Sequence, residues 1–249
     1  MDFEAPIMKN ICLVTIDTPD MSQLADMTWR QNKLPYCARH DYDFRRRVHN
    51  EPLGDNSLAK KPMGLDSWPY AGFDKILYVE KVMSENRHDW IAWFDCDTLV
   101  TNFSVTLESI ITQLRPCTVF AVTADHAAVN GGVFLIKNDE VGKSYLSYLK
   151  SRMYETAASN EYLFGEEQTA MIESVKDPQF SSVIEVLPQR TMNSYPYHLY
   201  GRPADQKDQT GHIGNWLEKD FVIHIPGFGP DLYQDRLRHF SLYLPLVSK

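Results

Sequence analysis

The chain has 249 residues, of which 43% are hydrophobic and 12% aromatic, and its formal net charge at pH 7 is -8. This length suits one large domain or two small ones, and the apolar content argues against disorder over most of the chain. The negative charge argues against nonspecific binding to nucleic acid or an anionic membrane, and the absence of any run of about 18 apolar residues argues against a membrane span.

Short apolar runs typical of buried strands alternate along the chain with segments that have the periodicity of amphipathic helices. Strands are predicted at residues 11–16, 42–48, 90–94, 118–123, 132–137, 183–187 and 221–224. Helices are predicted at about 21–33, 73–85, 105–114, 140–154, from 166 onward and 231–243. Loops are predicted at 50–69 and 195–214, and the second is a candidate lid or binding loop. This alternation predicts an α/β fold with a mostly parallel sheet, in one domain.

The cysteines and the amino terminus bear on the compartment. The amino terminus lacks the basic and apolar regions of a signal peptide. The four cysteines form no Cys-x-x-Cys pair, and three lie in apolar, strand-like surroundings. We therefore interpret them as small core residues in a reducing compartment.

The apolar run at 90–94 ends in two carboxylates, Asp95 and Asp97. Burying unpaired carboxylates is costly, so the pair must be solvated, hydrogen-bonded or bound to a cation. The carboxyl end of a strand is where open α/β sheets bind ligands. Two carboxylates separated by one residue can offer oxygens to Mg²⁺ or Mn²⁺ and leave positions open for phosphate oxygens. The pair fits turn aspartates equally well when taken alone.

His224 ends another apolar run, at residues 221–224. A neutral imidazole at a strand end can complete a metal site begun by carboxylates, and this mixture of ligands favours Mn²⁺ over Ca²⁺. The alternative is a hydrogen-bonded core histidine. The glycines at 227 and 229 leave room for a phosphate to approach the backbone.

Three further segments carry polar groups that suit a sugar nucleotide. Asn130-Gly131-Gly132 lies ahead of an apolar run, so a ligand could approach the backbone while Asn130 binds sugar hydroxyls; an ordinary tight turn fits as well. Lys75, on the helix before the aspartates, could reach a diphosphate or be solvated. At the start of a helix, Glu167 could grip sugar hydroxyls with Gln168 facing the reacting carbon, although acidic residues are also ordinary there.

The order of several segments is more specific than any one of them. They are Asn32-Lys33, His40-Asp41-Tyr42-Asp43, Trp90–Thr98, Val129–Asn138, Glu166–Ala170, Leu187–Pro196 and Val222–Gly227. Together they resemble glycosyltransferase family 34, the galactosyl, mannosyl and xylosyl transferases. The stretch at 187–196, with its Pro-Gln-Arg and Asn-Ser-Tyr-Pro groups, is the most specific. The resemblance runs from about Ile11 to Phe240.

The resemblance implies a GT-A fold, in which a Rossmann-like, mostly parallel central sheet is flanked by helices. One domain over residues 1–249 would join a nucleotide-binding half at about 9–125 to an acceptor-binding half at about 126–245. The implied enzyme depends on Mn²⁺, or on Mg²⁺, and moves a hexose or pentose from a nucleotide-diphosphate sugar to a glycan acceptor with retention of configuration. A UDP-sugar is favoured as the donor, with GDP-mannose as the second choice.

The resemblance also implies roles for single residues. The metal ligands would be Asp95, Asp97 and His224. The residues around the donor would be Thr15 and Asp17 near the nucleoside, Lys75 and Gly227 at the diphosphate, and Asp95, Asn130, Gly131 and Gly132. The catalytic residues would be Gln168, Glu167 and Asp97. Gln168 would stabilise the sugar cation, and a covalent role for Glu166 or Glu167 stays open.

Two other functions fit parts of the pattern. A metal-dependent phosphohydrolase or nucleotidyltransferase needs the same acidic pair, but it does not require the segments at 193–196 and 224–227. A carbohydrate-binding protein without catalysis could retain the metal site.

Members of family 34 are usually anchored in membranes of the secretory pathway. Because this chain shows no such anchor, we expect a soluble, cytoplasmic enzyme. Its negative charge leads us to expect no nucleic-acid partner.

Overall fold

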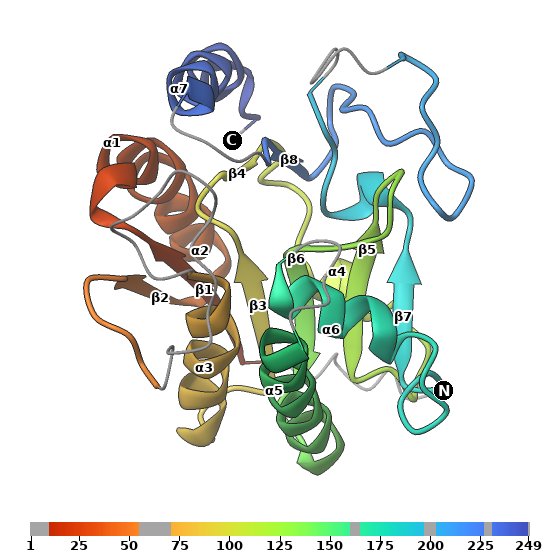
Figure 1. The fold of residues 1–249 in the computed structure, drawn as a ribbon. Coiled ribbons are helices and arrows are strands. Elements are labelled where there is room, and N and C mark those ends of the chain that lie inside the picture. The colour runs from red at the N-terminus through yellow and green to blue at the C-terminus, as the bar shows by residue number, and fades with distance from the viewer. Residues whose placement is uncertain (1–9, 55–70, 160–164, 197–202, 227–230, 249) are drawn as a thin grey trace, which may run out of the picture.

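A six-stranded sheet forms the centre of the computed structural model, which describes residues 10–54, 71–159, 165–196, 203–226 and 231–248 (Figure 1). The strand order is β2-β1-β3-β6-β5-β7. Five strands run in one direction, and β6 is antiparallel to both of its neighbours. The strands are β1 (Ile11–Asp17), β2 (Asp43–Val48), β3 (Trp90–Phe94), β5 (Phe120–Ala124), β6 (Val129–Lys137) and β7 (Ile184–Leu187). The predicted α/β fold with a mostly parallel sheet is confirmed.

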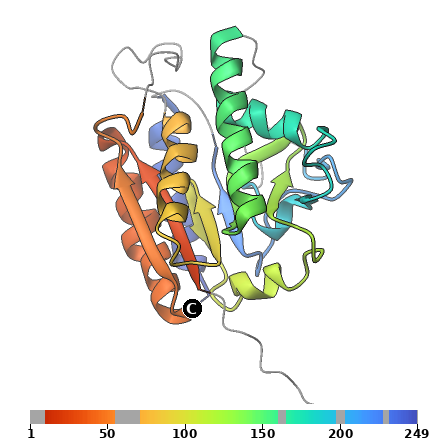
Figure 2. The same ribbon diagram turned by 90° about the horizontal axis from the view of Figure 1, so that it is seen from below.

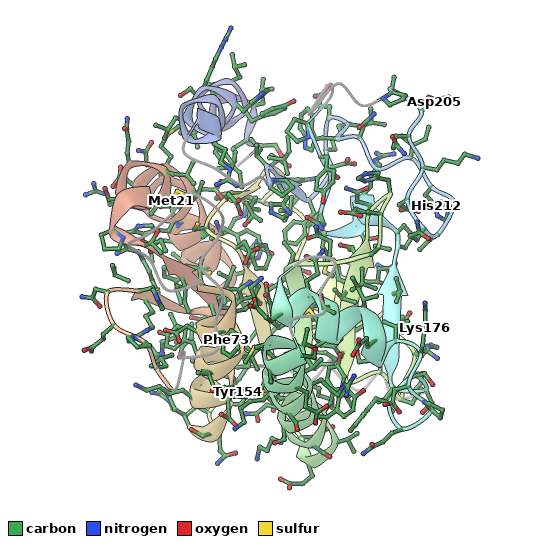
Figure 3. The ribbon with its side chains drawn as sticks, in the orientation of Figure 1. Met21, Phe73, Tyr154, Lys176, Asp205 and His212 are labelled. Carbon is green, nitrogen blue, oxygen red and sulfur yellow. The ribbon has the colours of Figure 1, made fainter. Side chains whose placement is uncertain are left out.

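Helices cover both faces of this sheet (Figure 2). One face carries α3 (Ala71–Ser84), α5 (Glu140–Ser159) and α6 (Glu166–Ser174). The other carries α4 (Leu107–Ile111) and a continuous helical run made of α1 (Ser22–Ala25), η2 (Asp26–Lys33) and α2 (Leu34–His40). Because side chains alternate along a strand, Val14 of β1 enters the first core and Leu13 enters the second. Phe73 of α3 meets Tyr154 of α5 edge to face, with ring centroids 5.2 Å apart (Figure 3).

A second, two-stranded sheet lies beyond the carboxyl end of β3. It pairs β4 (Thr98–Val100) with β8 (Val222–His224) in antiparallel register, which sets Thr98 opposite His224. The last long helix, α7 (Asp231–Tyr243), lies beside this small sheet and near α1 (Figure 1). Leu237 and Phe240 of α7 pack with Leu24, Leu99 and Ile223 in a third apolar cluster.

The helix predicted at 21–33 in fact continues to His40. Residues 26–33 form a π-helix, in which the Leu34 N–H bonds to the Trp29 carbonyl. Pro35, which has no backbone N–H to donate to the preceding turn, lies inside the continuous run, just after the point where the π-helix passes into α2. The run ends at Asp41, whose φ of 58° is left-handed.

Three more details differ from the predictions. β6 begins at Val129 and not at Gly132, so Asn130-Gly131-Gly132 lies within the strand, at a register shift against β5. Of the four cysteines, Cys12 and Cys37 are buried as expected, but Cys117 is exposed because it lies in the turn before β5. β4 was not predicted, since a three-residue strand carries little periodicity and its partner is far away in the sequence. Among the described helices, none is both long and apolar enough to cross a membrane.

Candidate metal and donor site

The two aspartates and the histidine meet at one point of the structure. Asp95 follows the last residue of β3, Asp97 precedes β4, and His224 ends β8. Each offers a ligand atom, and these atoms lie within 4.8 Å of one another. His224 Nε2 is 3.2 Å from Asp97 Oδ1. Two carboxylates and an imidazole form a donor set that suits a divalent transition metal such as Mn²⁺.

The backbone on both sides holds these ligands in place. The Asp95 N–H donates to the Gly132 carbonyl at 2.8 Å, and the Thr98 hydroxyl donates to the Asp95 carbonyl at 2.7 Å. The Ile225 N–H donates to the Asp97 carbonyl at 3.0 Å, which continues the pairing of β4 with β8. The ligands are therefore set by strand register and not by a free loop.

The imidazole of His224 is oriented by Asn193. Its Nδ1 lies 2.6 Å from Asn193 Oδ1, and an amide oxygen can only accept, so Nδ1 donates and Nε2 faces Asp97. Asn193 is fully buried. A second group that holds the first ligands in this way is a common feature of metal sites. Sequence reasoning placed Asn193 in a polar stretch but did not assign this role.

Gly132 leaves the space that His224 fills. A Cβ atom at position 132 would lie 2.2 Å from His224 Cε1 and 2.6 Å from His224 Nδ1. At position 131 a Cβ would meet the flexible end of Met171 at 3.0 Å and would lie at ordinary contact distance, 3.8 Å, from Lys75 Nζ. The predicted approach of a ligand to these glycines stays a prediction, and the group that lies closest to Gly132 in the structure is the imidazole of His224.

Lys75 joins four elements at the site. Its Nζ lies 3.1 Å from Asp95 Oδ1 and 3.4 Å from Glu167 Oε1, and it donates to the Gly131 carbonyl at 3.1 Å. Trp93, whose indole Nε1 donates to Asp95 Oδ1 at 2.7 Å, lies below it with the ring centroid 5.5 Å from Nζ. Burial lowers the pKa of Lys75, but the two carboxylates outweigh it and raise the pKa overall. The buried ammonium therefore stays charged.

Glu167 lies in the first turn of α6 and is buried, with only 5% of its surface exposed. Burial raises its pKa, and the charge of Lys75 only partly opposes this. Its Oε2 atom has no hydrogen-bond partner among the residues that the structure describes. Gln168 follows it and is half-buried. Among the described side chains, Lys75 links Glu167 to the candidate metal ligand Asp95. Gln168 takes no part in this chain of contacts.

Thr15 and Asp17 lie at the carboxyl end of β1, the strand next to β3. Asp17 is buried and accepts two hydrogen bonds from the guanidinium of Arg46, at 2.6 and 2.7 Å. That guanidinium stacks over Trp29, 4.5 Å from the ring centroid. The hydroxyl of Thr15 is buried and has no partner in the described part of the chain. These residues share the sheet edge of the metal site but do not touch its ligands.

Asn130 is held inside the protein. Its Nδ2 donates to Tyr195 OH at 2.8 Å and to Asp125 Oδ2 at 3.2 Å, and its Oδ1 accepts from the Gly132 N–H at 2.9 Å. Burial raises the pKa of Asp125, but the donors around it, with Tyr195 first, lower it overall. The role expected for Asn130 in binding sugar hydroxyls stays a prediction. Gly227, expected at the diphosphate, lies outside the described residues.

Arg236 of α7 also reaches the site. Its Nη2 lies 3.3 Å from Asp97 Oδ2, and its side chain is buried. Burial raises the pKa of Asp97, but Arg236 and then His224 outweigh it, so the pKa falls far below its usual range. Helical periodicity predicted α7 from the sequence, but no motif signals that one of its arginines would meet an aspartate at the sheet edge.

The chain matches the galactosyl transferase GMA12/MNN10 family over residues 9–117 and 116–230. It belongs to this family. Among curated proteins, the probable alpha-1,6-mannosyltransferase MNN10 of Saccharomyces cerevisiae is 23% identical over 252 residues. That match covers 88% of this chain and 60% of the yeast protein, so the family member described here spans less than two thirds of its relative.

Solved structures share the fold. A glycosyltransferase involved in the glycosylation of the major capsid of PBCV-1 superposes with a TM-score of 0.65 at 18% identity, over 94% of this chain and 99% of the other. The galactosyltransferase LgtC superposes with a TM-score of 0.52 at 11% identity, over 96% of each chain. At such low identity these likenesses show the fold alone, and they confirm the predicted GT-A fold.

Asn193→Ala removes the acceptor that orients His224. We expect the affinity for Mn²⁺ to fall roughly 10- to 100-fold, because the imidazole can then rotate or change tautomer. Isothermal titration calorimetry with Mn²⁺ measures the change. The exposed Asn50, replaced by alanine, is the control. An unchanged affinity in the Asn193 variant would show that the hydrogen bond does not orient the ligand.

Gly132→Ala and Gly131→Ala form a matched pair. The first must displace the His224 ring, so we expect loss of Mn²⁺ binding and a free energy of unfolding lower by about 1–3 kcal/mol. The second displaces the flexible end of Met171 and meets Lys75 Nζ at an ordinary contact distance, so it should retain most of both. Mn²⁺ titration and urea unfolding of both variants provide the comparison. Equal losses in the two variants would contradict this account.

Proposed function

We propose that the protein is a Mn²⁺-dependent retaining glycosyltransferase that moves a hexose or pentose from a nucleotide-diphosphate sugar to a glycan acceptor. One observation carries the proposal: Asp95, Asp97 and His224 converge at the sheet edge in a chain of the GMA12/MNN10 family. A nucleotide-sugar donor needs both a cation for its diphosphate and a platform for its nucleoside at the end of a parallel sheet.

The names of related proteins support the substrate class. The yeast relative is a probable mannosyltransferase, and LgtC is a galactosyltransferase whose structure holds donor and acceptor sugar analogs. These names differ in the sugar, so we propose a hexose or pentose and not one particular donor. We favour a UDP-sugar and retain GDP-mannose as the second choice. We also propose that residues of about 9–125 bind the nucleotide and those of about 126–245 bind the acceptor.

The chemical need of the reaction is stabilisation of a departing diphosphate. A divalent cation bound by Asp95, Asp97 and His224 would supply that stabilisation as a Lewis acid. Lys75 adds a fixed positive charge on the other side of Asp95, close to Glu167. Because it is held by three partners, it needs little reorganisation as negative charge develops on the leaving group. Thr15, with its free buried hydroxyl, and Asp17 would bind the nucleoside.

The sugar would lie between the metal ligands and the start of α6. Glu167 places a buried carboxylate there, with one oxygen on Lys75 and the other without a partner in the described part of the chain. The free oxygen can accept a hydrogen bond from a sugar hydroxyl. Gln168 would stabilise the positive charge that develops on the sugar. We propose that the acceptor hydroxyl attacks from the face that the diphosphate leaves, which retains the configuration of the sugar.

The function is tested by incubating purified protein with a panel of UDP- and GDP-sugars, Mn²⁺ and mono- or oligosaccharide acceptors. Nucleoside diphosphate release and mass spectrometry of the acceptor are followed together. We expect release with at least one donor, and a glycoside product that retains the donor configuration. A sugar phosphate or a sugar nucleotide as product would favour a phosphohydrolase or a nucleotidyltransferase instead. If the protein turns over none of the donors in the panel, the proposal is contradicted.

Asp97→Ala should lower the transfer rate on the order of a thousandfold, because it removes a metal ligand that acts on the leaving group. Asp205→Ala is the matched control, since Asp205 is exposed on an outer loop away from the site (Figure 3). Circular dichroism checks that both variants fold. A transfer rate of the Asp97 variant close to that of the control would exclude Asp97 from the catalytic machinery.

A further inference from the structure

The π-helical turn η2 lies against the segment that carries the metal ligands. Three of its polar residues, Thr28, Asn32 and Lys33, are fully buried, each with 0% of its surface exposed. None of them belongs to the metal and donor site described above. A lysine without any exposed surface is rare in proteins, and its charge needs partners.

All three side chains bind the backbone of one short segment, residues 96–100. The Thr28 hydroxyl donates to the Cys96 carbonyl at 2.6 Å, and Lys33 Nζ donates to the Thr98 carbonyl at 2.6 Å. Asn32 makes two hydrogen bonds of 2.8 Å with Val100, one to its carbonyl and one from its N–H. The contacted residues alternate, so the helix side chains occupy one edge of an extended strand.

The opposite edge of the same segment is occupied by β8. Thr98 pairs with His224 there, and the Asp97 carbonyl accepts from the Ile225 N–H. The carbonyl at 97 thus points to β8, while those at 96, 98 and 100 point to η2. Both edges of segment 96–100 are therefore hydrogen-bonded, which fixes the backbone from which the Asp97 side chain extends. Side chains of a helix thereby take the place of a neighbouring strand.

The π form explains how three side chains reach one edge. In an α-helix, with ~3.6 residues per turn, position i+5 points about 140° away from position i. Wider π turns, with i to i+5 bonding, bring positions i+4 and i+5 to either side of position i. Thr28, Asn32 and Lys33 stand in this relation, and Lys33 Nζ also donates to the Thr28 carbonyl at 3.3 Å. A regular helix would turn Lys33 away from the segment.

Lys33 also brings charge. Burial lowers its pKa to about 8, with Cys96, Asp97 and Asp95 acting in the opposite direction, so the ammonium is charged at neutral pH. Its two hydrogen-bond acceptors given above are carbonyls, so no carboxylate neutralises it directly. The ammonium binds the carbonyl of Thr98, the residue after Asp97. From there its positive charge reduces the mutual repulsion of Asp95 and Asp97.

We propose that Lys33 is a positioning residue of the metal site, and that with Thr28 and Asn32 it holds segment 96–100 so that Asp95 and Asp97 meet His224. The inference rests on the proposed function only in taking this site to bind Mn²⁺. It assigns to the π-helical turn a part in metal affinity, although the hydrogen bonds of Thr28, Asn32 and Lys33 go to other residues than Asp95, Asp97 and His224.

The test is Mn²⁺ titration of the whole chain without donor, by calorimetry or by the electron paramagnetic resonance signal of free Mn²⁺. Lys33→Met keeps the length of the side chain and removes its charge and its donors. We expect its dissociation constant for Mn²⁺ to rise roughly 10-fold or more, the range seen for groups that support metal ligands. Lys33→Arg, which retains a charge and donors, should recover part of the affinity. Lys81→Met is the control, since Lys81 is exposed on α3.

A second variant covers the case in which Lys33→Met does not fold. Thr28→Val keeps the shape of the side chain and removes the hydroxyl that donates to the Cys96 carbonyl and, at 3.1 Å, to the Leu24 carbonyl, so we expect a smaller loss, of roughly three- to tenfold. In transfer assays, the KM for Mn²⁺ should rise in both variants while kcat at saturating Mn²⁺ changes by no more than about threefold. A purely structural role for Lys33 would lower the melting temperature without this split.

The outcomes separate this inference from the proposed function. Folded variants that bind Mn²⁺ as tightly as the unchanged chain would overturn the positioning role and leave the transferase proposal standing. An unchanged chain that binds no Mn²⁺ would overturn both. Transfer activity that is absent in the unchanged chain, together with Mn²⁺ binding that weakens in the variants, would support the positioning role and contradict only the transferase.

Discussion

Repulsion between carboxylates is the constraint on which the rest of this structure depends. Asp95 and Asp97 lie at one sheet edge, and Glu167 joins them through Lys75 in surroundings with little access to water. Such a group of like charges is unfavourable unless each member has a cation or donors nearby. Lys75 lies within ion-pair distance of Asp95 and Glu167, while His224 and Arg236 lie within that distance of Asp97. The site can hold its acidic groups together because Lys75 lies between Asp95 and Glu167 and Arg236 lies beside Asp97.

These partners come from elements that the apolar clusters hold in place. Lys75 is on α3, which packs on one face of the sheet, and Arg236 is on α7, whose neighbours Leu237 and Phe240 pack in the third apolar cluster. His224 comes from β8 through its register with β4. Packing energy therefore positions the charges, and the charged groups need not stabilise the fold themselves. This division agrees with the proposed function, in which donor and metal would bind at a preformed site.

The sequence singled out Asp95, Asp97 and His224 as candidate metal ligands because these residue types stand at the ends of apolar runs, and the structure brings their ligand atoms within 4.8 Å of one another. It also identified Lys75 and Glu167, although it did not predict that one would pair with the other. Asn193 and Arg236 were missed as site residues. An amide or an arginine has many uses at a surface, and nothing local distinguishes the one that meets a ligand. The π turn was missed for another reason, since periodicity does not separate it from an α-helix over eight residues.

By itself, the sequence determined the alternation of strands and helices, the chemical types available for a metal site and the membership of the family. These follow from local periodicity and from ordered motifs. Only the tertiary structure decided that β4 pairs with β8, that η2 takes the other edge of the segment at 96–100 and that α7 adds a cation. Such contacts join residues far apart in the chain. Their geometry depends on how the layers pack, and no local preference of the backbone encodes it.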